Sequence, residues 1–174
     1  MLTTKVEMAY KYDLLWQSND KIYVTDGENF DTFTLSQGQG TTKGTFTQDG
    51  SSTFSKEVEA YYPQSMVKGQ NLYWPEIQTQ NQTVPMYSKS TLQGTKDESM
   101  NFSSLGSVLQ IVLNTTQENI TLKKIVIKDE NKFLSGSFSV NEDGQAIITS
   151  ENGAGITLDL AQGHVLGRGA NYLT

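Results

Sequence analysis

The stretch "DLLWQSNDKIYVTDG", residues 13–27, places a tryptophan and a small polar cluster directly before an alternating pattern. Ile22 and Val24 alternate with Tyr23 and Thr25, and an Asp-Gly pair follows. Alternation of this kind, ended by a turn pair, is typical of a β-strand with one buried face. The stretch therefore predicts a strand whose Ile22 and Val24 point into a core.

Trp16 has two interpretations. It could form an aromatic platform for a ligand beside Asp20, or it could cover the open end of the core that Ile22 and Val24 enter. We favour the second, with residues 18–20 forming a turn whose side chains bind backbone N–H groups.

The period of two recurs along most of the chain. Phe33 and Leu35 alternate with threonines, and the segment 44–63 combines a hairpin with Val58, Ala60 and Tyr62 on one face. Turn residues separate five further strand candidates, which lie at residues 107–113, 120–128, 134–140, 145–150 and 155–160. This pattern predicts an all-β protein, a single antiparallel β-sandwich of seven or more strands over residues 1–174.

Two segments depart from the alternation. Residues 63–100 contain all three prolines and many Gln and Asn residues, which predicts a functional loop or an edge segment laid over the core. Phe102, Leu105 and Leu109 recur at helical spacing and predict one short helical turn.

Composition narrows the function classes. The chain has 174 residues, no cysteine, one histidine and a net charge of -6. These values exclude a disulfide scaffold, thiolate metal sites and a cysteine nucleophile, and they argue against nucleic acid as a partner. The basic run of Lys123, Lys124 and Lys128 is interrupted by apolar residues and reads as a solvated strand face.

The Ser-, Thr- and Asn-rich, weakly charged composition favours an exported β-protein. No apolar run approaches the roughly 20 residues that span a bilayer, and residue 1 begins no signal peptide. The expectation is a cytoplasmic protein or a piece of a longer exported one.

Several motifs imitate sites. "QGQGTTKG" (37–44) and "GHVLGRG" (163–169) have the glycines of phosphate loops but open no helix, so both predict turns, with Gly163, Gly167 and Gly169 as turn residues. Three polar clusters imitate calcium loops without their spacing: Asp20, Asp26 and Asp31; Asp129, Glu130 and Asn131; Asn141, Glu142 and Asp143. His164 could pair with a serine and a carboxylate, but the sequence contains no Gly-x-Ser-x-Gly nucleophile elbow. We predict no catalytic residue, metal or cofactor.

The aromatic residues are the remaining site candidates. Tyr61, Tyr73 and Trp74, together with Trp16 and Tyr62, could stack against sugars, although β-sandwich cores also use aromatic residues. A carbohydrate-binding surface module is therefore the alternative function, with Tyr61, Tyr73 and Trp74 as its site.

A collinear series of motifs resembles the fimbrillin-like family of Bacteroidales over most of residues 12–160. "LWQSNDKIYVTDG" resembles its opening Trp-x-x-x-Asp-x-Ile-x-Val signature. The series continues with "FDTFTL", "GTFTQDGSSTF", "YYP", "WPEIQ", "FSSLGSVLQIVL" and "ITLKKIVIKDENKFLSGSFSV".

The resemblance implies a transthyretin-like sandwich of Greek-key type, the first of two domains in an exported, outer-membrane-associated lipoprotein. It also implies a non-enzymatic fimbrial subunit that serves assembly or adhesion. The implied partners are other subunits, joined by strand addition, or surface glycans and proteins. The lipoprotein signal and its cysteine are not in this sequence.

Residues 1–12, "MLTTKVEMAYKY", carry Val6, Met8 and Tyr10 at alternating positions. This segment is either an ordinary first strand or a strand that can fill an edge and be released from it.

Overall fold

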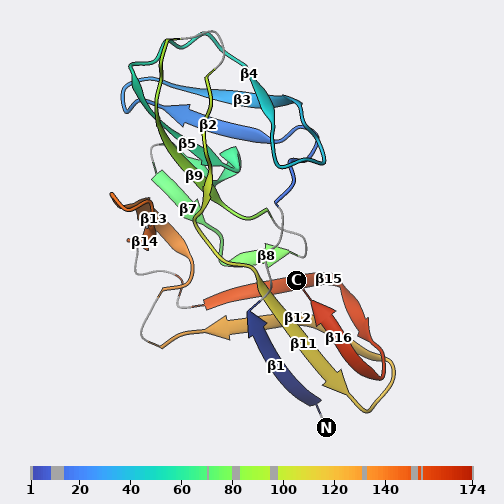
Figure 1. Cartoon of the computed structure of the whole chain (residues 1–174). Coiled ribbons are helices and arrows are strands. Elements are labelled where there is room, and N and C mark those ends of the chain that lie inside the picture. The colour runs from blue at the N-terminus through green and yellow to red at the C-terminus, as the bar shows by residue number, and fades with distance from the viewer. Residues whose placement is uncertain are drawn as a thin grey trace.

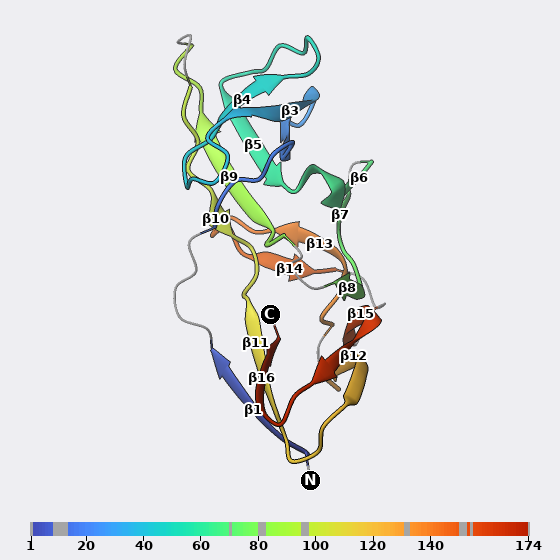
Figure 2. The same cartoon turned by 90° about the vertical axis from the view of Figure 1, so that its right-hand side faces the viewer.

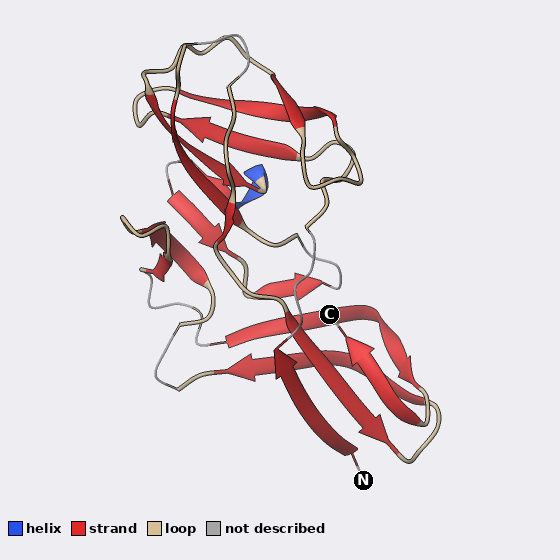
Figure 3. Cartoon of the chain, in the orientation of Figure 1, coloured by secondary structure: helices blue, strands red, loops and turns tan. Residues whose placement is uncertain are grey.

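The computed structural model describes residues 2–8, 14–69, 71–79, 83–94, 98–130, 133–149, 153 and 155–173. Strands dominate this part of the chain (Figure 3), and its helical structure is one 3-10 turn, η1 (Gln64–Met66). Nothing helical in these ranges is long and apolar enough to cross a membrane. The predicted all-β class is confirmed. The transthyretin-like Greek-key arrangement and the single domain stay predictions.

A six-stranded sheet forms the upper part of the molecule in Figure 1. Its members, in spatial order, are β10 (Ser103–Ser104), β9 (Met86–Thr91), β5 (Glu57–Tyr62), β2 (Lys21–Thr25), β3 (Phe30–Gln37) and β4 (Thr45–Gln48). Ile22, Val24, Val58, Ala60 and Tyr62 project from one face into the first core, as the alternation predicts. The "QGQGTTKG" glycines lie in the β3–β4 turn, which confirms the hairpin interpretation.

The opposite face of this sheet packs against a four-stranded sheet. That second sheet has the order β14 (Ala146–Ile148), β13 (Gly136–Val140), β7 (Asn71–Trp74) and β6 (Val67–Lys68). The second core between them contains Tyr61, Met66, Leu72, Tyr87 and Phe138. Strand β5 thus contributes to both cores, because successive side chains point to opposite faces.

Two three-stranded sheets share the third core. One has the order β1 (Leu2–Met8), β11 (Leu109–Thr115) and β16 (Gly169–Leu173). The other has the order β12 (Ile120–Lys128), β15 (Gly155–Leu166) and β8 (Ile77–Thr79), in which β8 runs parallel to β15. Figure 2 shows the two sheets on opposite sides, meeting at the lower end. Ile111, Leu113, Leu166 and Leu173 form the core there. The three lysines of the basic run are exposed on β12, an edge strand, where charge discourages unwanted pairing.

The prediction of a loop over residues 63–100 is wrong. This segment contains η1, β6, β7, β8 and β9, and β9 lies between β5 and β10 inside the six-stranded sheet. Its strands have two to six residues, too few to show a period. Met86, Tyr87 and Ser88 of β9 are all buried, because both faces of the strand are packed, and this removes the alternation.

Two smaller predictions are also wrong. Residues 102–109 form β10 and the start of β11 rather than a helical turn, because Phe102 packs against the first core and Leu105 against the second. Gly163 lies within β15, beside the register shift between Leu122 and Lys124 of β12, and its φ of 83° suits a glycine there. Gly167 lies between β15 and β16, and Gly169 begins β16.

Candidate functional site

Trp16 belongs to the first core and not to a ligand site. Its side chain is 7% exposed. Phe46, Tyr62 and Phe102 meet its ring edge to face, with centroid separations of 4.9, 5.0 and 5.8 Å. The expected cover over the core is confirmed, since the ring is buried among other aromatic side chains.

The polar cluster after Trp16 is a turn. Asp20 accepts a hydrogen bond from the Gln17 backbone N–H on Oδ2 at 2.6 Å, and its own N–H donates to the Gln17 carbonyl at 3.2 Å. Asn19 has a φ of 65°, a left-handed conformation that asparagine tolerates. The expected backbone contact of Asp20 is therefore present.

The aromatic residues proposed for sugar stacking do not share an exposed face. Tyr61 is 8% exposed in the second core, and its hydroxyl donates to Glu59 Oε2 at 2.6 Å. Tyr73 and Trp74 are successive residues of β7 and so point to opposite faces. Tyr73 is exposed, whereas Trp74 packs against the second core. The structure brings Tyr61 and Trp74 to one core and leaves Tyr73 apart from them.

An apolar cleft of about 720 Å³ lies beside Trp74 and is a candidate binding site. β7, β13 and β14 line one part of it, and β8, β11, β12 and β15 line another. Leu109, Phe133 and Ile147 line it and are nonetheless 38%, 41% and 49% exposed. Among the lining residues, the polar ones are neutral: Gln78, Thr79, Thr83 and Ser107. The described lining of the cleft therefore suits apolar side chains or apolar ligands.

Strand β1 lies next to one wall of this cleft, because it pairs with β11. Among the described strands it pairs with β11 alone, antiparallel and in unbroken register from Leu2 opposite Thr115 to Met8 opposite Leu109. β16 pairs with the other side of β11. Leu109 and Ile111 of β11 line the cleft, so the strand that receives β1 also forms a cleft wall. Tyr10 of the proposed exchange segment lies outside the described residues.

Two members of the polar cluster of Asp20, Asp26 and Asp31 accept backbone hydrogen bonds at turns. Asp26 accepts hydrogen bonds from the backbone N–H groups of Ser55, Asn29 and Glu28. These bonds, that of Ser55 foremost, hold the pKa of the Asp26 carboxyl well below its usual range. The carboxylates of Asp20 and Asp26 thus bind backbone at separate turns.

Asp31 likewise serves the fold. It accepts from Gln48 Nε2 at 2.8 Å and from the Ser52 N–H at 3.2 Å, and the Gln48 bond is the leading cause of its lowered pKa. Within the described ranges, no group of three or more His, Asp or Glu residues is placed to hold a metal ion. Asn131, which belongs to the polar cluster of Asp129, Glu130 and Asn131, lies outside those ranges.

The sequence interpretation missed the cleft because seven strands between residues 74 and 158 line it, and no local pattern joins them. A signal existed only in Phe133 and Ile147, which are apolar residues beside turns. The edge strand β1 and the apolar cleft, whose walls include β11, together offer a surface that can bind a ligand or another chain. No family model, curated protein or solved structure matches this chain.

Proposed function

We propose that this chain is a non-enzymatic, fimbrial-subunit-like protein of the cell surface, which joins other subunits by exchanging an edge strand. The observation that carries the proposal is the placement of β1. In the part of the chain that the structure describes, this seven-residue strand is paired with one neighbour only, β11. Such a strand can be replaced by the equivalent segment of another chain without breaking any other described strand pair.

The chemistry of β11 supports this role. A released β1 would leave a row of unpaired N–H and C=O groups along β11, and main-chain hydrogen bonds of that kind give strand addition its affinity. Ile111 and Leu113 of β11 lie in the third core, and Leu109 lines the apolar cleft. An incoming strand would therefore contact apolar surface as well as the free backbone N–H and C=O groups of β11. Without such a strand, the uncovered edge of β11 would be prone to aggregation.

The finer parts of the proposal rest on the sequence. The collinear motifs over most of residues 12–160 support a transthyretin-like, Greek-key sandwich and an outer-membrane location. The polar, weakly charged composition is in keeping with an exported protein. The alternative of a carbohydrate-binding module built on Tyr61, Tyr73 and Trp74 has less support, because these rings share no exposed face.

The test uses a chain that lacks residues 1–11 and a synthetic peptide of residues 1–12, mixed in a calorimeter. We expect the shortened chain to fold and to bind the peptide at one site. A matched peptide with both Lys5→Pro and Val6→Pro is the control. Successive N–H groups of a strand point to opposite sides, so one of the two prolines must remove a donor to β11 in the middle of the ladder. The control should not bind.

Two results would refute the proposal. If the shortened chain does not fold, β1 is an integral strand. If it folds and ignores the peptide, or binds the double-proline peptide equally well, no specific strand exchange takes place at β11.

A further inference from the structure

One row of side chains crosses the six-stranded sheet on the face opposite the first core. The register places Phe30 of β3 opposite Thr25 of β2, Thr25 opposite Glu59 of β5, and Glu59 opposite Lys89 of β9. These four strands lie side by side in Figure 1. Neighbouring strands are about 4.8 Å apart, so the row extends over roughly 14 Å. We call it the Phe30–Lys89 row.

The Phe30 end of the row is an open aromatic surface. The side chain of Phe30 is 63% exposed. One side of its ring stacks on Tyr23, with centroids 5.7 Å apart and ring planes 18° from parallel. Tyr23 is itself anchored against the second core. The stack therefore supports the Phe30 ring through Tyr23, while most of the Phe30 side chain stays accessible to a ligand.

The middle of the row is a fixed carboxylate. Glu59 Oε2 accepts the Tyr61 hydroxyl at 2.6 Å, and Oε1 accepts the Tyr87 hydroxyl at 3.0 Å. Burial, and secondarily the bond to Glu59, raises the pKa of Tyr61 and raises that of Tyr87 to about 12, so both phenols stay protonated donors. Each carboxylate oxygen has two lone-pair positions. One acceptor position per oxygen therefore remains for another donor.

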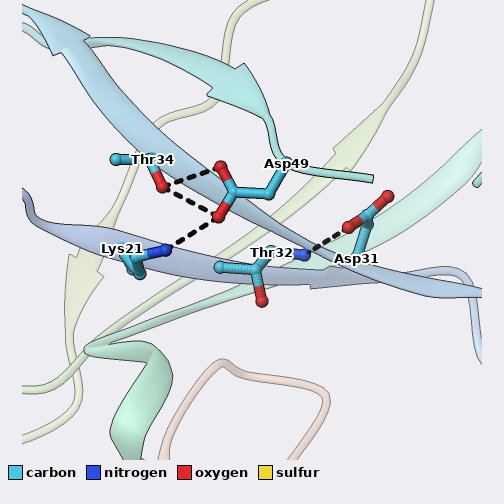
Figure 4. A network of polar contacts seen from close by, with 5 residues as sticks. All are labelled: Lys21, Asp31, Thr32, Thr34 and Asp49. Atoms are coloured by element: carbon cyan, nitrogen blue, oxygen red, sulfur yellow. Dashed lines mark hydrogen bonds and ion pairs between the residues drawn. The ribbon is translucent and has the colours of Figure 1, made fainter. Parts of the chain in front are cut away.

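The Lys89 end supplies a donor. Lys89 is exposed, and among the described residues no carboxylate forms an ion pair with it. The far end of the same sheet face differs. There, Asp49 already binds Lys21 at 2.8 Å and the Thr34 hydroxyl at 2.7 Å (Figure 4). That network is closed on itself, whereas the Phe30–Lys89 row retains its bonding capacity.

We propose that the Phe30–Lys89 row binds a neutral oligosaccharide of two or three pyranose units. A pyranose presents a face of C–H bonds, which packs on an aromatic ring, and a rim of hydroxyls, which both donate and accept. Phe30 takes the C–H face, Glu59 accepts from ring hydroxyls, and Lys89 donates to them. The row carries one negative and one positive charge, which favours a neutral sugar over an acidic one. The inference does not rest on strand exchange, because β1 and β11 belong to another sheet.

The test is binding of the full chain to a printed array of neutral and sialylated oligosaccharides, with titration of the strongest hit. We expect neutral glycans to bind, and Phe30→Ala to weaken the strongest interaction roughly tenfold through loss of the stacking contact. Glu59→Gln should weaken it too, because it removes charge-assisted acceptors. Tyr172→Ala is the matched control: Tyr172 is an exposed aromatic residue of β16, 61% accessible, and its loss should leave affinity within about twofold.

The inference is overturned if no neutral glycan binds, if Phe30→Ala binds as well as the unaltered chain, or if Tyr172→Ala is equally damaging. Phe30→Ala changes an exposed side chain, so thermal melting should be nearly unchanged and loss of binding will not reflect unfolding. None of these variants alters β1 or β11. Failure here would therefore leave the peptide titration of the shortened chain unaffected, and the reverse also holds.

Discussion

Replacing Trp16 with alanine is expected to destabilise the protein by about 5 kcal/mol. Truncation of a buried Phe or Trp costs about 3–5 kcal/mol. The upper end applies here, because Trp16 makes three edge-to-face contacts, and each such pair contributes about 0.5–1.5 kcal/mol beyond burial. The backbone bonds of Trp16 to Thr41 and Gly40 survive the substitution, so the loss belongs to the ring.

The measurement is chemical unfolding followed by far-UV circular dichroism, since Trp16 is one of only two tryptophans and its removal disturbs fluorescence. A change of about 5 kcal/mol corresponds to roughly 10–20 °C in Tm for a chain of this size. Trp74→Ala is the matched control. Trp74 is half-buried at the cleft, so its truncation opens onto existing space and should cost about half as much or less.

A Trp16→Ala variant within about 1 kcal/mol of the unaltered chain would refute the assignment of this residue to the core. So would equal losses for the two tryptophans, because the difference in their surroundings would then have no energetic consequence. Either result would return Trp16 to the ligand interpretation.

Two more changes test the packing and the turns. Gly44→Ala should cost about 1–3 kcal/mol in urea unfolding, because the new Cβ would lie 2.6 Å from Leu35 Cδ1 and 2.9 Å from a Phe46 ring carbon; an unchanged midpoint would contradict this crowding. Asp26→Asn should be less stable than the unaltered chain at pH 7. A lowered folded-state pKa gives stability that is present above the ordinary value of 3.8 and lost as the pH falls through the folded-state pKa, so the difference between the two proteins should shrink only below pH 3.8. A gap that stays constant through that range would show that the Asp26 charge is not responsible.

The sequence predicted those strands in which one face is buried and the other is not. β2 is of this kind, and so is β12, whose observed bounds Ile120–Lys128 match the predicted ones. In each, burial alternates along the strand and the hydropathy pattern follows it. The cover over the first core was also predictable, because an isolated tryptophan directly before a strand has few other places to pack.

Prediction failed where a strand is packed on both faces or is very short. β9 carries three consecutive buried residues, Met86, Tyr87 and Ser88, and so has no period. β6 has two residues and β8 three. In these strands the pairing partner stabilises the backbone, and the partner is distant in sequence. β8, for example, runs parallel to β15, some 80 residues away.

The two candidate sites were hidden from the sequence for a related reason. The alternating pattern indicates which face of its own strand each residue of the row occupies. It does not indicate which strands are neighbours, or in what register they pair. Only the pairings of β3 with β2, β2 with β5 and β5 with β9 align these residues in one row. A shift of one residue in any of these pairings would place part of the row in the first core. The proposed glycan site therefore depends on the register of the sheet, and the register depends on Ile22, Val24, Val58 and Ala60 filling that core from the other face. It follows that a core substitution such as Val58→Ala can weaken glycan binding only through the sheet, with a matching loss of stability, whereas Phe30→Ala should weaken binding without that loss.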